Sequence, residues 1–568
     1  MLIVHDQLQP MQDAPIQLLG NRVDILSKKI DYTEIIIRNG KIETIRVLQD
    51  GPKAGASFIL PGFIDSHVHI ESSMLIPTEF ARMAVVHGTV ATISDPHEIA
   101  NVCGVKGVHF MIENGKKVPF KFHFGAPSCV PATQFETAGD SINSEAVDAL
   151  LASEDIYYLS EMMNYPGVLQ GDTEVMKKIA ASKKWGKPVD GHAPGLRGDA
   201  ARKYIQAGIT TDHECFTAAE AEEKLQAGMK ILIREGSAAK NFDALIALLN
   251  KYPDQMMFCS DDKHPDSLAT GHINELCARA IQAGIPLFSV LRAACINPIL
   301  HYKMRVGMLR EGDAADCIIV NNFDEWQVEE TYINGVRVAK NGNSLIEVGP
   351  KVEPINSFQA NPVSAFDLSI STDEYPMNLD GTIPVIEALD GQLITRQMNI
   401  KGKESNTEWI TDTTSDILKI VVVNRYHPAP IAKAFVAGFG LTKGAIASSV
   451  AHDSHNIVAV GVDDASIAAA INLIISSKGG VSCVSDGMNE NDALLELPVA
   501  GLMSTENGYW VAEKYTAIDK KAKLLGSKLN APFMTLSFMC LLVIPHIKIS
   551  DFGLFNGDSF SFFRSTIK

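Results

Sequence analysis

The sequence predicts an α/β protein with three parts: a (β/α)8 TIM-like barrel, a small β-sandwich built from both flanks of that barrel, and a C-terminal α/β domain. Short apolar runs alternate with helix-length segments in the middle of the chain, β-type patterns flank that segment on both sides, and a stretch rich in Pro, Ser and Asn separates the last part. At 568 residues, the chain also exceeds what one hydrophobic core usually serves.

The two flanks of the barrel segment carry hairpin signals. The first contains two β-rich runs joined at Asn39-Gly40, and the second contains two runs joined at Asn334-Gly335. Asn-Gly between such runs is a strong hairpin signal, and we expect the second flank to complete a β unit that the first begins. The expected boundaries are 1–60 and 296–350 for the sandwich, 61–295 for the metal-binding barrel, and 375–568 for the C-terminal domain.

The barrel prediction depends on alternation along the middle segment. Short apolar runs separated by helix-length stretches indicate parallel strands with crossover helices. An open doubly wound sheet is the alternative, but no Gly-rich dinucleotide fingerprint follows the first strand. Another short strand, at 58–60, is expected to enter a Pro-Gly turn just before the first histidine pair. The runs expected to be strands of the alternating segment are 89–93, 121–124, 157–159, 209–211 and 256–259.

The last part of the chain follows a linker-like stretch at 349–376. Within it we expect strands at 418–423 and 457–460 and an Ala- and Ile-rich helix at 464–477. The segment Gly438-Phe-Gly-Leu-Thr-Lys-Gly444 resembles a phosphate loop superficially, but its spacing fits neither standard glycine motif.

Composition narrows the classes of protein and partner. Hydrophobic residues make up 46% and charged residues 21% of the chain, as in an ordinary globular protein. The formal charge of -17 argues against nucleic acid as a partner. The first residues lack the pattern of a signal peptide, and the longest nearly apolar run, 533–544, is too short to span a bilayer, so we expect a cytoplasmic protein without membrane contact. Nine cysteines without a Cys-x-x-Cys pair argue against a disulfide framework or a thiolate zinc site.

Residues of metal-ligand type lie where the predicted strands end. His67 and His69 are two apart, so a strand can present both imidazoles to one metal ion. Asp and His also cap turns and helices, but parallel barrel strands all direct their C-terminal ends to one mouth. Histidine and carboxylate ligands without thiolate suit Zn, Mn or Fe, with carboxylates favouring the harder ions. The further candidates at strand ends are Asp95, His97, Glu98, Glu161, His192, His213 and Asp261.

Several motifs resemble those of a known family. The segment 61–69, Pro-Gly-Phe-Ile-Asp-Ser-His-Val-His, resembles the first-strand signature of the amidohydrolase superfamily, and 307–316 resembles the segment that leads such chains back into their β-sandwich. The likeness to the bacterial-type adenine deaminase family is more specific and covers nearly the whole chain. The segments that carry it are 70–73, 94–101, 160–167, 190–194, 260–265, 448–456 and 497–504.

This resemblance implies a dinuclear site for divalent metal, with Mn(II) or Fe(II) favoured and Zn(II) as the alternative. His67, His69 and Asp261 would hold one ion, His192 and His213 the second, and Glu161 would bridge them. Many relatives bridge their ions with a carboxylated lysine, but 157–166 contains no lysine, so the bridging carboxylate must come from the glutamate.

The resemblance also implies an activity: hydrolytic deamination of adenine to hypoxanthine and ammonia, within purine salvage or adenine catabolism. Hydroxide between the metals would attack C6, and Asp261 is the expected proton shuttle, with Glu161, His97 and Glu98 as the other catalytic candidates. Asp95-Pro96 also fits an ordinary turn, and the polar loop at 452–455 also fits a solvated surface. We expect a homo-oligomer, with a dimer favoured. The expected substrate contacts are His97, Glu98, Asp262, His264, His452 and His455.

Two other functions remain open at this point. A related amidohydrolase could act on another aminated heterocycle or on a cyclic amide, although the lysine-free bridge segment argues against the cyclic amide. A metal-dependent scaffold or inactive sensor would bind ligand without releasing ammonia. The thiolate class of zinc deaminases is disfavoured, because its His-x-Glu and Pro-Cys-x-x-Cys signature is absent from the sequence.

Overall fold

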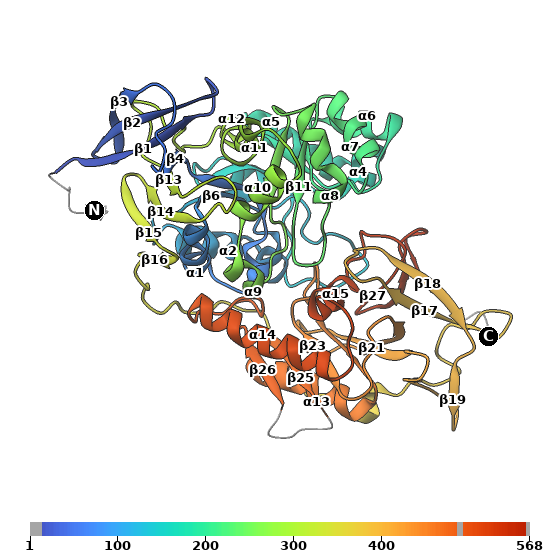
Figure 1. The fold of residues 1–568 in the computed structure, drawn as a ribbon. Helices are drawn as coiled ribbons and strands as arrows, with labels where there is room; N and C mark the ends of the chain where they lie inside the picture. The colour runs from blue at the N-terminus through green and yellow to red at the C-terminus, as the bar shows by residue number, and fades with distance from the viewer. Residues whose placement is uncertain (1–13, 486–491, 564–568) are drawn as a thin grey trace, which may run out of the picture.

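The computed structural model describes residues 14–485 and 492–563 of the chain. Figure 1 shows a small sheet that joins the blue N-terminal strands to yellow strands from the middle of the chain, a central α/β part in blue to green, and a C-terminal part in orange and red. In the described part of the chain, we find no helix with the length and apolar character needed to cross a bilayer.

The small sheet draws its strands from both flanks of the central part. Its order is β16-β15-β14-β13-β4-β1-β2-β3, and the two flanks meet where β4 and β13 pair antiparallel, with Leu60 opposite Ile318. The strands are β1 (Ile16–Asp24), β2 (Lys29–Arg38), β3 (Lys41–Gln49), β4 (Phe58–Pro61), β13 (Cys317–Val320), β14 (Val328–Ile333), β15 (Val336–Lys340) and β16 (Asn343–Ser344).

The two Asn-Gly hairpins are confirmed, and their tips touch. Asn39 and Gly40 have φ values of 48° and 75°, and Asn334 and Gly335 have 47° and 73°. Two consecutive positive φ angles are those of a type I′ turn, which matches the twist of paired strands. Ala315 joins the tips, since its N–H donates to the Gly40 carbonyl and its carbonyl accepts from the Gly335 N–H, each at 2.9 Å.

The central part contains a curled parallel sheet in two hydrogen-bonded sections, β5-β6-β7-β8-β9 and β10-β11-β12. A parallel bridge between Val68 and Asp261 joins the ends of the two sections, and the Thr210 N–H donates to the Val189 carbonyl at the other junction. Complete closure into a barrel stays a prediction. The strands are β5 (Phe63–Val68), β6 (Thr89–Ser94), β7 (Lys121–Ala126), β8 (Ile156–Met162), β9 (Val189–Gly191), β10 (Thr211–Asp212), β11 (Lys230–Arg234) and β12 (Met256–Cys259).

Helices connect these strands, and several begin at side chains that cap them. Asp172 accepts from the N–H groups of Glu174 and Val175, and Thr217 accepts from that of Glu220. Such caps satisfy backbone donors that the first helical turn leaves free. The helices are α1 (Pro77–Ala84), α2 (His97–Gly115), α3 (Ser144–Leu151), α4 (Tyr165–Gln170), α5 (Thr173–Lys184), α6 (Gly198–Ala207), α7 (Ala218–Gln226), α8 (Phe242–Leu245), α9 (Pro265–Thr270), α10 (Ile273–Gln282), α11 (Leu287–Leu291) and α12 (Asn297–Tyr302).

The prediction that the strand at 58–60 leads into the histidine pair was wrong. The run at 58–60 is β4 of the small sheet and does not carry the histidines. The chain turns at Gly62, where an added Cβ would lie 2.3 Å from a methyl group of Val90, and a new strand, β5, begins at Phe63. His67 therefore lies within the last residues of β5, and His69 follows that strand. The strand β11 was also missed.

The C-terminal part is built on a mostly antiparallel sheet with the order β18-β17-β22-β21-β24-β23-β25-β26. The predicted strands at 418–423 and 457–460 and the predicted helix at 464–477 are confirmed as β21, β24 and α13. The strands are β17 (Ile383–Ala388), β18 (Thr395–Ile400), β19 (Lys403–Ser405), β20 (Glu408–Ile410), β21 (Leu418–Val423), β22 (Ala432–Ala437), β23 (Ala445–Ser448), β24 (Ile457–Gly461), β25 (Gly480–Val484), β26 (Ala493–Glu496), β27 (Ile547–Ser550), β28 (Gly553–Asn556) and β29 (Ser561–Phe562). The helices are α13 (Asp464–Ser477), α14 (Gly508–Leu524) and α15 (Pro532–Phe538).

The C-terminal part packs on the face of the central part where the parallel strands end. Helix α14 runs beside α1 and α9 (Figure 1), and the Gly508 N–H at its start donates to Glu79 of α1 at 3.0 Å. The Ser504 N–H donates to the Met74 carbonyl at 2.8 Å. These contacts hold the C-terminal part against that face.

Candidate metal and active site

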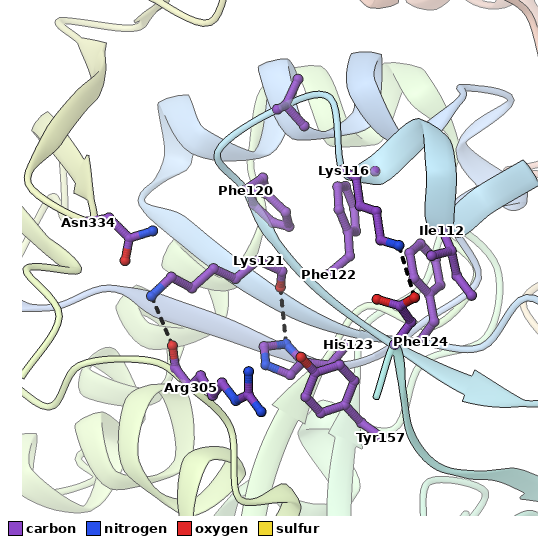
Figure 2. Close-up of a pocket in the computed structure, with 13 residues that line it drawn as sticks. Ile112, Lys116, Phe120, Lys121, Phe122, His123, Phe124, Tyr157, Arg305 and Asn334 are labelled. Carbon is purple, nitrogen blue, oxygen red and sulfur yellow. Dashed lines mark hydrogen bonds and ion pairs between the residues drawn. The ribbon is translucent and has the colours of Figure 1, made fainter. Parts of the chain in front are cut away.

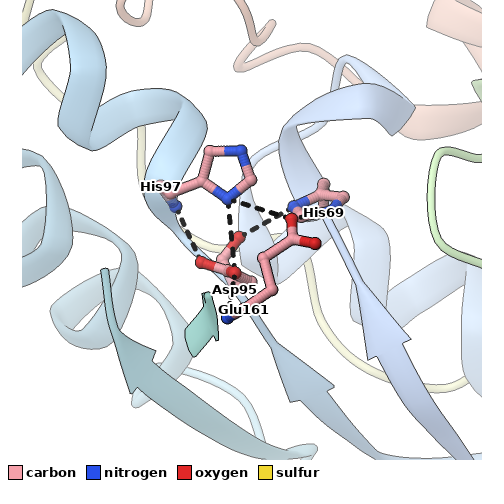
Figure 3. A group of neighbouring side chains, drawn as sticks. All are labelled: His69, Asp95, His97 and Glu161. Atoms are coloured by element: carbon pink, nitrogen blue, oxygen red, sulfur yellow. Dashed lines mark hydrogen bonds and ion pairs between the residues drawn. The ribbon is translucent and has the colours of Figure 1, made fainter. Parts of the chain in front are cut away.

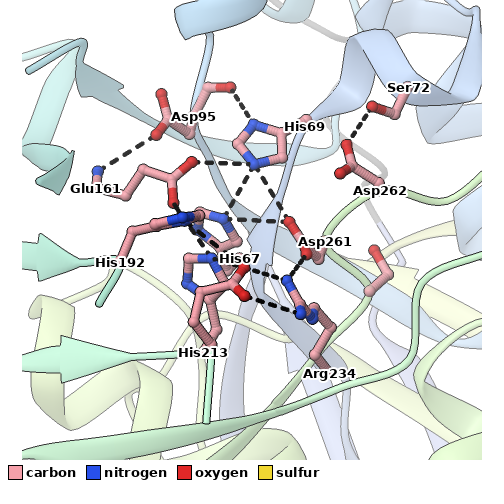
Figure 4. Close-up of polar contacts among 12 residues, drawn as sticks. His67, His69, Ser72, Asp95, Glu161, His192, His213, Arg234, Asp261 and Asp262 are labelled. Atoms are coloured by element: carbon pink, nitrogen blue, oxygen red, sulfur yellow. Dashed lines mark hydrogen bonds and ion pairs between the residues drawn. The ribbon is translucent and has the colours of Figure 1, made fainter. Parts of the chain in front are cut away.

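Six buried side chains converge at the C-terminal ends of the parallel strands (Figure 4). They come from five different strand ends, which is why no local sequence motif contains them all. The six are His67 and His69 from β5, Glu161 from β8, His192 after β9, His213 after β10 and Asp261 after β12.

One half of this cluster is formed by His67, His69 and Asp261. The two imidazole Nε2 atoms lie 3.1 Å apart. Asp261 Oδ1 is 3.5 Å from the first and 3.2 Å from the second. Three atoms with lone pairs thus face a common point, as the ligands of a cation do.

Glu161 connects the first half of the cluster to the second. Its Oε2 lies 2.8 Å from His192 Nδ1 and 3.2 Å from His213 Nε2. Its Oε1 lies 3.4 Å from His69 Nε2. A single carboxylate therefore faces both groups of histidines.

The donor set fits divalent metal. Imidazoles and carboxylates converge without a thiolate, a combination that suits Zn, Mn or Fe. Within the described residues, both His67-His213-Asp261 and Glu161-His192-His213 place their ligand atoms within 4.8 Å of one another. A bound divalent cation would offset the charge of the buried carboxylates and satisfy the lone pairs of the buried imidazoles.

Arg234 and Glu214 support this cluster, and sequence reasoning missed both. Arg234 ends β11 and is fully buried, with Nη1 2.7 Å from Asp261 Oδ2 and Nη2 3.0 Å from Glu214 Oε2. Burial raises the pKa of Asp261, but Arg234 and His67 outweigh burial and hold that pKa well below its usual range. An arginine that closes an apolar run at a strand end was the available signal.

His97 lies against the cluster (Figure 3). Its Nδ1 is 3.3 Å from Asp95 Oδ2 and 3.6 Å from Glu161 Oε1. Burial lowers the pKa of His97, but Asp95 and Glu98 raise it well above its usual value. Asp95 also accepts from the His97 and Glu161 N–H groups, so it shapes the turn and orients the histidine at once.

Glu98 joins the central part to the C-terminal part. Its Oε1 accepts from His452 Nδ1 at 2.5 Å, and its Oε2 accepts from His455 Nε2. Burial raises the pKa of Glu98, but the two histidines outweigh it and hold that pKa well below its usual range. Both histidines are buried, so the alternative of a solvated loop at 452–455 is wrong.

The two remaining predicted contacts differ. Asp262 lines the same cavity, accepts from Ser72 Oγ, and lies 3.9 Å from His452 Nε2. His264 begins α9 and packs edge-on against Tyr515 with ring centroids 4.6 Å apart, and it does not line the cavity. Its ring packs between α9 and α14, away from the six converging residues.

The cavity lies between the ligand cluster and the C-terminal part. One wall carries the six ligand-type residues except His67, together with His97 and Glu98. The opposite wall comes from the C-terminal part and combines polar and apolar side chains. These are Leu393, His452, Asp453, Phe538 and Leu541.

Another cavity, of about 350 Å³, lies at the other end of β7 (Figure 2). Lys121 Nζ donates to the Arg305 carbonyl at 2.9 Å, and His123 Nδ1 donates to the Lys121 carbonyl at 3.1 Å. Burial lowers the pKa of His123 to about 4, so its ring is neutral near pH 7. This cavity lacks a convergent ligand set among the described residues and does not fit the chemistry of the strand ends.

The glycine-rich loop at 438–444 does not present a phosphate site. Asp416 Oδ2 accepts from the Gly438 N–H at 2.8 Å, and its Oδ1 accepts from the Gly440 N–H at 2.7 Å. An internal carboxylate therefore occupies the backbone donors that a phosphate would need.

Comparisons with known proteins agree with this architecture. Residues 58–338 match the family model "Amidohydrolase family", and residues 392–561 match "Adenine deaminase C-terminal domain". Proteins named adenine deaminase from Salinibacter ruber and Sulfurovum sp. are 51% and 50% identical, each over 97% of this chain and over 98% and 99% of their own lengths. The adenine deaminase of Methanosarcina mazei is 49% identical over 96% of this chain and 98% of its own. The chain therefore belongs to the adenine deaminase family of amidohydrolases.

Proposed function

We propose that the chain is a metal-dependent hydrolase that deaminates adenine to hypoxanthine and ammonia. The observation that carries this proposal is Glu161, which faces both histidine groups of the convergent cluster in a chain of the adenine deaminase family. A glutamate supplies the bridging carboxylate that many other amidohydrolases take from a carboxylated lysine.

The six converging residues fit two divalent ions. His67, His69 and Asp261 would hold one ion, His192 and His213 the other, and Glu161 would contact both. Mn(II) or Fe(II) is the proposed pair, with Zn(II) as the alternative. When bound, such cations lower the pKa of water and supply hydroxide near neutral pH.

Residues of the site carry the proton that the reaction requires. Loss of ammonia requires a proton on the departing nitrogen, and Asp261 is the proposed shuttle. Its Oδ2 is fixed by Arg234 at 2.7 Å, so its Oδ1 stays directed at the ligand cluster, where the proton is taken up and returned. His97 and Glu98 line the same wall of the cavity as the ligand-type residues and are the proposed contacts to the purine ring.

The C-terminal part excludes water from this chemistry. Leu393, Phe538 and Leu541 are buried and line the cavity opposite the ligands. Apolar side chains there suit the faces of a planar base and keep bulk water from the reacting atoms.

An absorbance assay over a purine panel tests the proposal. The chain is purified anaerobically, because iron sites are sensitive to oxidation, and is loaded with Mn(II) or Fe(II). We expect loss of adenine, formation of hypoxanthine and stoichiometric ammonia, each abolished by a chelator and restored by metal. Absence of adenine loss from the loaded protein refutes the proposal, and ammonia release from another heterocycle alone would redirect it. Light scattering on the same sample tests the expected homo-oligomer.

A further inference from the structure

His452 places a free nitrogen in the cavity. Its Nε2 is buried and makes no hydrogen bond with the described residues. Asp262 Oδ1, at 3.9 Å, is beyond hydrogen-bonding distance. Buried polar atoms in folded proteins nearly always have a hydrogen-bond partner, so an unpaired nitrogen that faces a cavity indicates a partner on a bound small molecule.

Two contacts hold the His452 ring, and a third holds its backbone. Its Nδ1 donates to Glu98 Oε1 at 2.5 Å, and its backbone N–H donates to Ser537 Oγ at 3.2 Å. The Phe538 ring stacks on the imidazole, with centroids 5.2 Å apart and an interplanar angle of 30°. The ring therefore cannot turn to bury its Nε2 elsewhere without losing these contacts.

Hydrogen bonds through His455 and Glu98 determine that Nδ1 of His452 carries a proton. The Ala451 N–H donates to His455 Nδ1 at 3.2 Å, so the proton of that ring lies on Nε2 and is donated to Glu98. The other carboxylate oxygen then accepts from His452 Nδ1. This chain of hydrogen bonds makes Nδ1 of His452 a donor and leaves Nε2 as the atom that meets the ligand.

We infer that His452 Nε2 donates a hydrogen bond to a ring nitrogen of the bound purine, and that the C-terminal part thereby supplies a specificity-determining residue. This inference rests on the proposed function. Adenine offers ring nitrogens as acceptors in addition to the amine that leaves, and the cavity wall that carries His452 faces the ligand cluster. Burial lowers the pKa of His452, but Glu98 and Asp262 raise it to about 9, which leaves a proton on both ring nitrogens near pH 7.

Two variants of His452 separate this role from a structural one. In His452→Asn the amide nitrogen takes the place of Nδ1, so the contact with Glu98 is kept and nothing replaces Nε2. In His452→Gln the amide reaches the place of Nε2. With metal-loaded protein, we expect His452→Asn to raise the KM for adenine and the dissociation constant of hypoxanthine by about tenfold to hundredfold, as for loss of a hydrogen bond to a charged group. His452→Gln should restore much of this loss, and metal content should stay the same in both variants.

A series of adenine analogues identifies the ring nitrogen. Inhibition constants of 1-, 3- and 7-deazaadenine are measured with wild type and with His452→Asn. The analogue that lacks the contacted nitrogen should bind both proteins equally, while the other two lose affinity in the variant. Equal binding of adenine by wild type and His452→Asn overturns the inference, as does the same loss for adenine and all three analogues. Failure of the proposed function is separate, because wild type would then leave adenine unchanged.

Discussion

Replacing Arg234 by methionine tests how the ligand cluster is stabilised. The guanidinium lies between two buried carboxylates, Asp261 and Glu214, and makes hydrogen bonds to both. Removing one partner of a buried ion pair costs about 3 to 5 kcal/mol, because an uncompensated charge stays behind. In metal-free protein, we therefore expect Arg234→Met to lower the midpoint of thermal unfolding markedly.

Although Arg234→Met should destabilise the metal-free protein, we expect it to increase the affinity for metal. Loss of an orienting contact weakens metal affinity by about tenfold to hundredfold, or about 1.4 to 2.8 kcal/mol. At a separation on the order of 5 Å and an effective dielectric constant of about 20, the repulsion between a single and a double positive charge is about 7 kcal/mol. The electrostatic effect is larger, so Arg234→Met should bind Mn(II) more tightly and gain more thermal stability from Mn(II) than wild type.

Two further variants serve as controls for this experiment. Arg234→Lys keeps the positive charge and should leave Mn(II) affinity unchanged or lower. Adding Glu214→Gln to Arg234→Met removes one uncompensated carboxylate and should recover part of the lost stability of the metal-free protein. Titration calorimetry and thermal unfolding with and without Mn(II) measure both effects. Weaker Mn(II) binding by Arg234→Met would show that orientation of Asp261 matters more than charge and would refute the reasoning.

Three other changes have defined outcomes. Glu161→Gln removes the negative charge shared by the two histidine groups, so inductively coupled plasma mass spectrometry should find at most one tightly bound ion per chain. The control Glu174→Gln in α5, whose carboxylate accepts a hydrogen bond from Ser144 outside the cluster, should keep the wild-type metal content. Burial lowers the pKa of Lys548 from 10.5 to about 7. Between these pH values the unfolded chain therefore binds a proton that the folded chain lacks, so the free energy of unfolding of the wild type increases as the pH rises. Lys548→Met also loses the hydrogen bonds from Nζ to the Leu393 and Phe538 carbonyls, a cost that does not change with pH. The unfolding midpoint of the variant relative to wild type should therefore be highest near pH 7 and fall progressively toward pH 10.5; a constant difference across this range would contradict the assignment. Gly40→Ala places a Cβ 2.9 Å from the Asn334 carbonyl oxygen, whereas in the control Gly51→Ala, at a similar positive φ, the Cβ meets no atom within 4 Å. Calorimetry should therefore show a larger loss of unfolding free energy for Gly40→Ala. Equal losses would mean that the hairpin tips do not touch in solution.

Local patterns and strand ends were the predictable features of this chain. The Asn-Gly turns need only two residues with positive φ, which the sequence names directly. The candidate site was predictable for a topological reason, since parallel strands end at one face and bring together His69, Glu161 and Asp261 whatever lies between them.

Features that depend on long-range pairing were not predictable. The sequence does not show where β4 ends and β5 begins, because apolar residues stand on both sides of the Pro-Gly pair, and only the pairing of β4 with β13 assigns β4 to the small sheet. Arg234 was missed for a similar reason. Its two carboxylate partners come from other strand ends, and an isolated arginine after Ile-Leu-Ile does not show what it pairs with. The contact between Glu98 and His452 spans the two halves of the chain and needs the full fold.

The pairing of β4 with β13 also sets the order of events during synthesis. Pro61 lies opposite Cys317, so about 250 residues of the central part must leave the ribosome before β4 meets this neighbour. At about 5 to 20 residues per second, that interval is about 13 to 50 s. During this interval, Ile59 and Leu60 lie at an unpaired strand edge, although both are fully buried in the finished sheet. The nascent chain therefore exposes an aggregation-prone apolar segment until β13 has been synthesised.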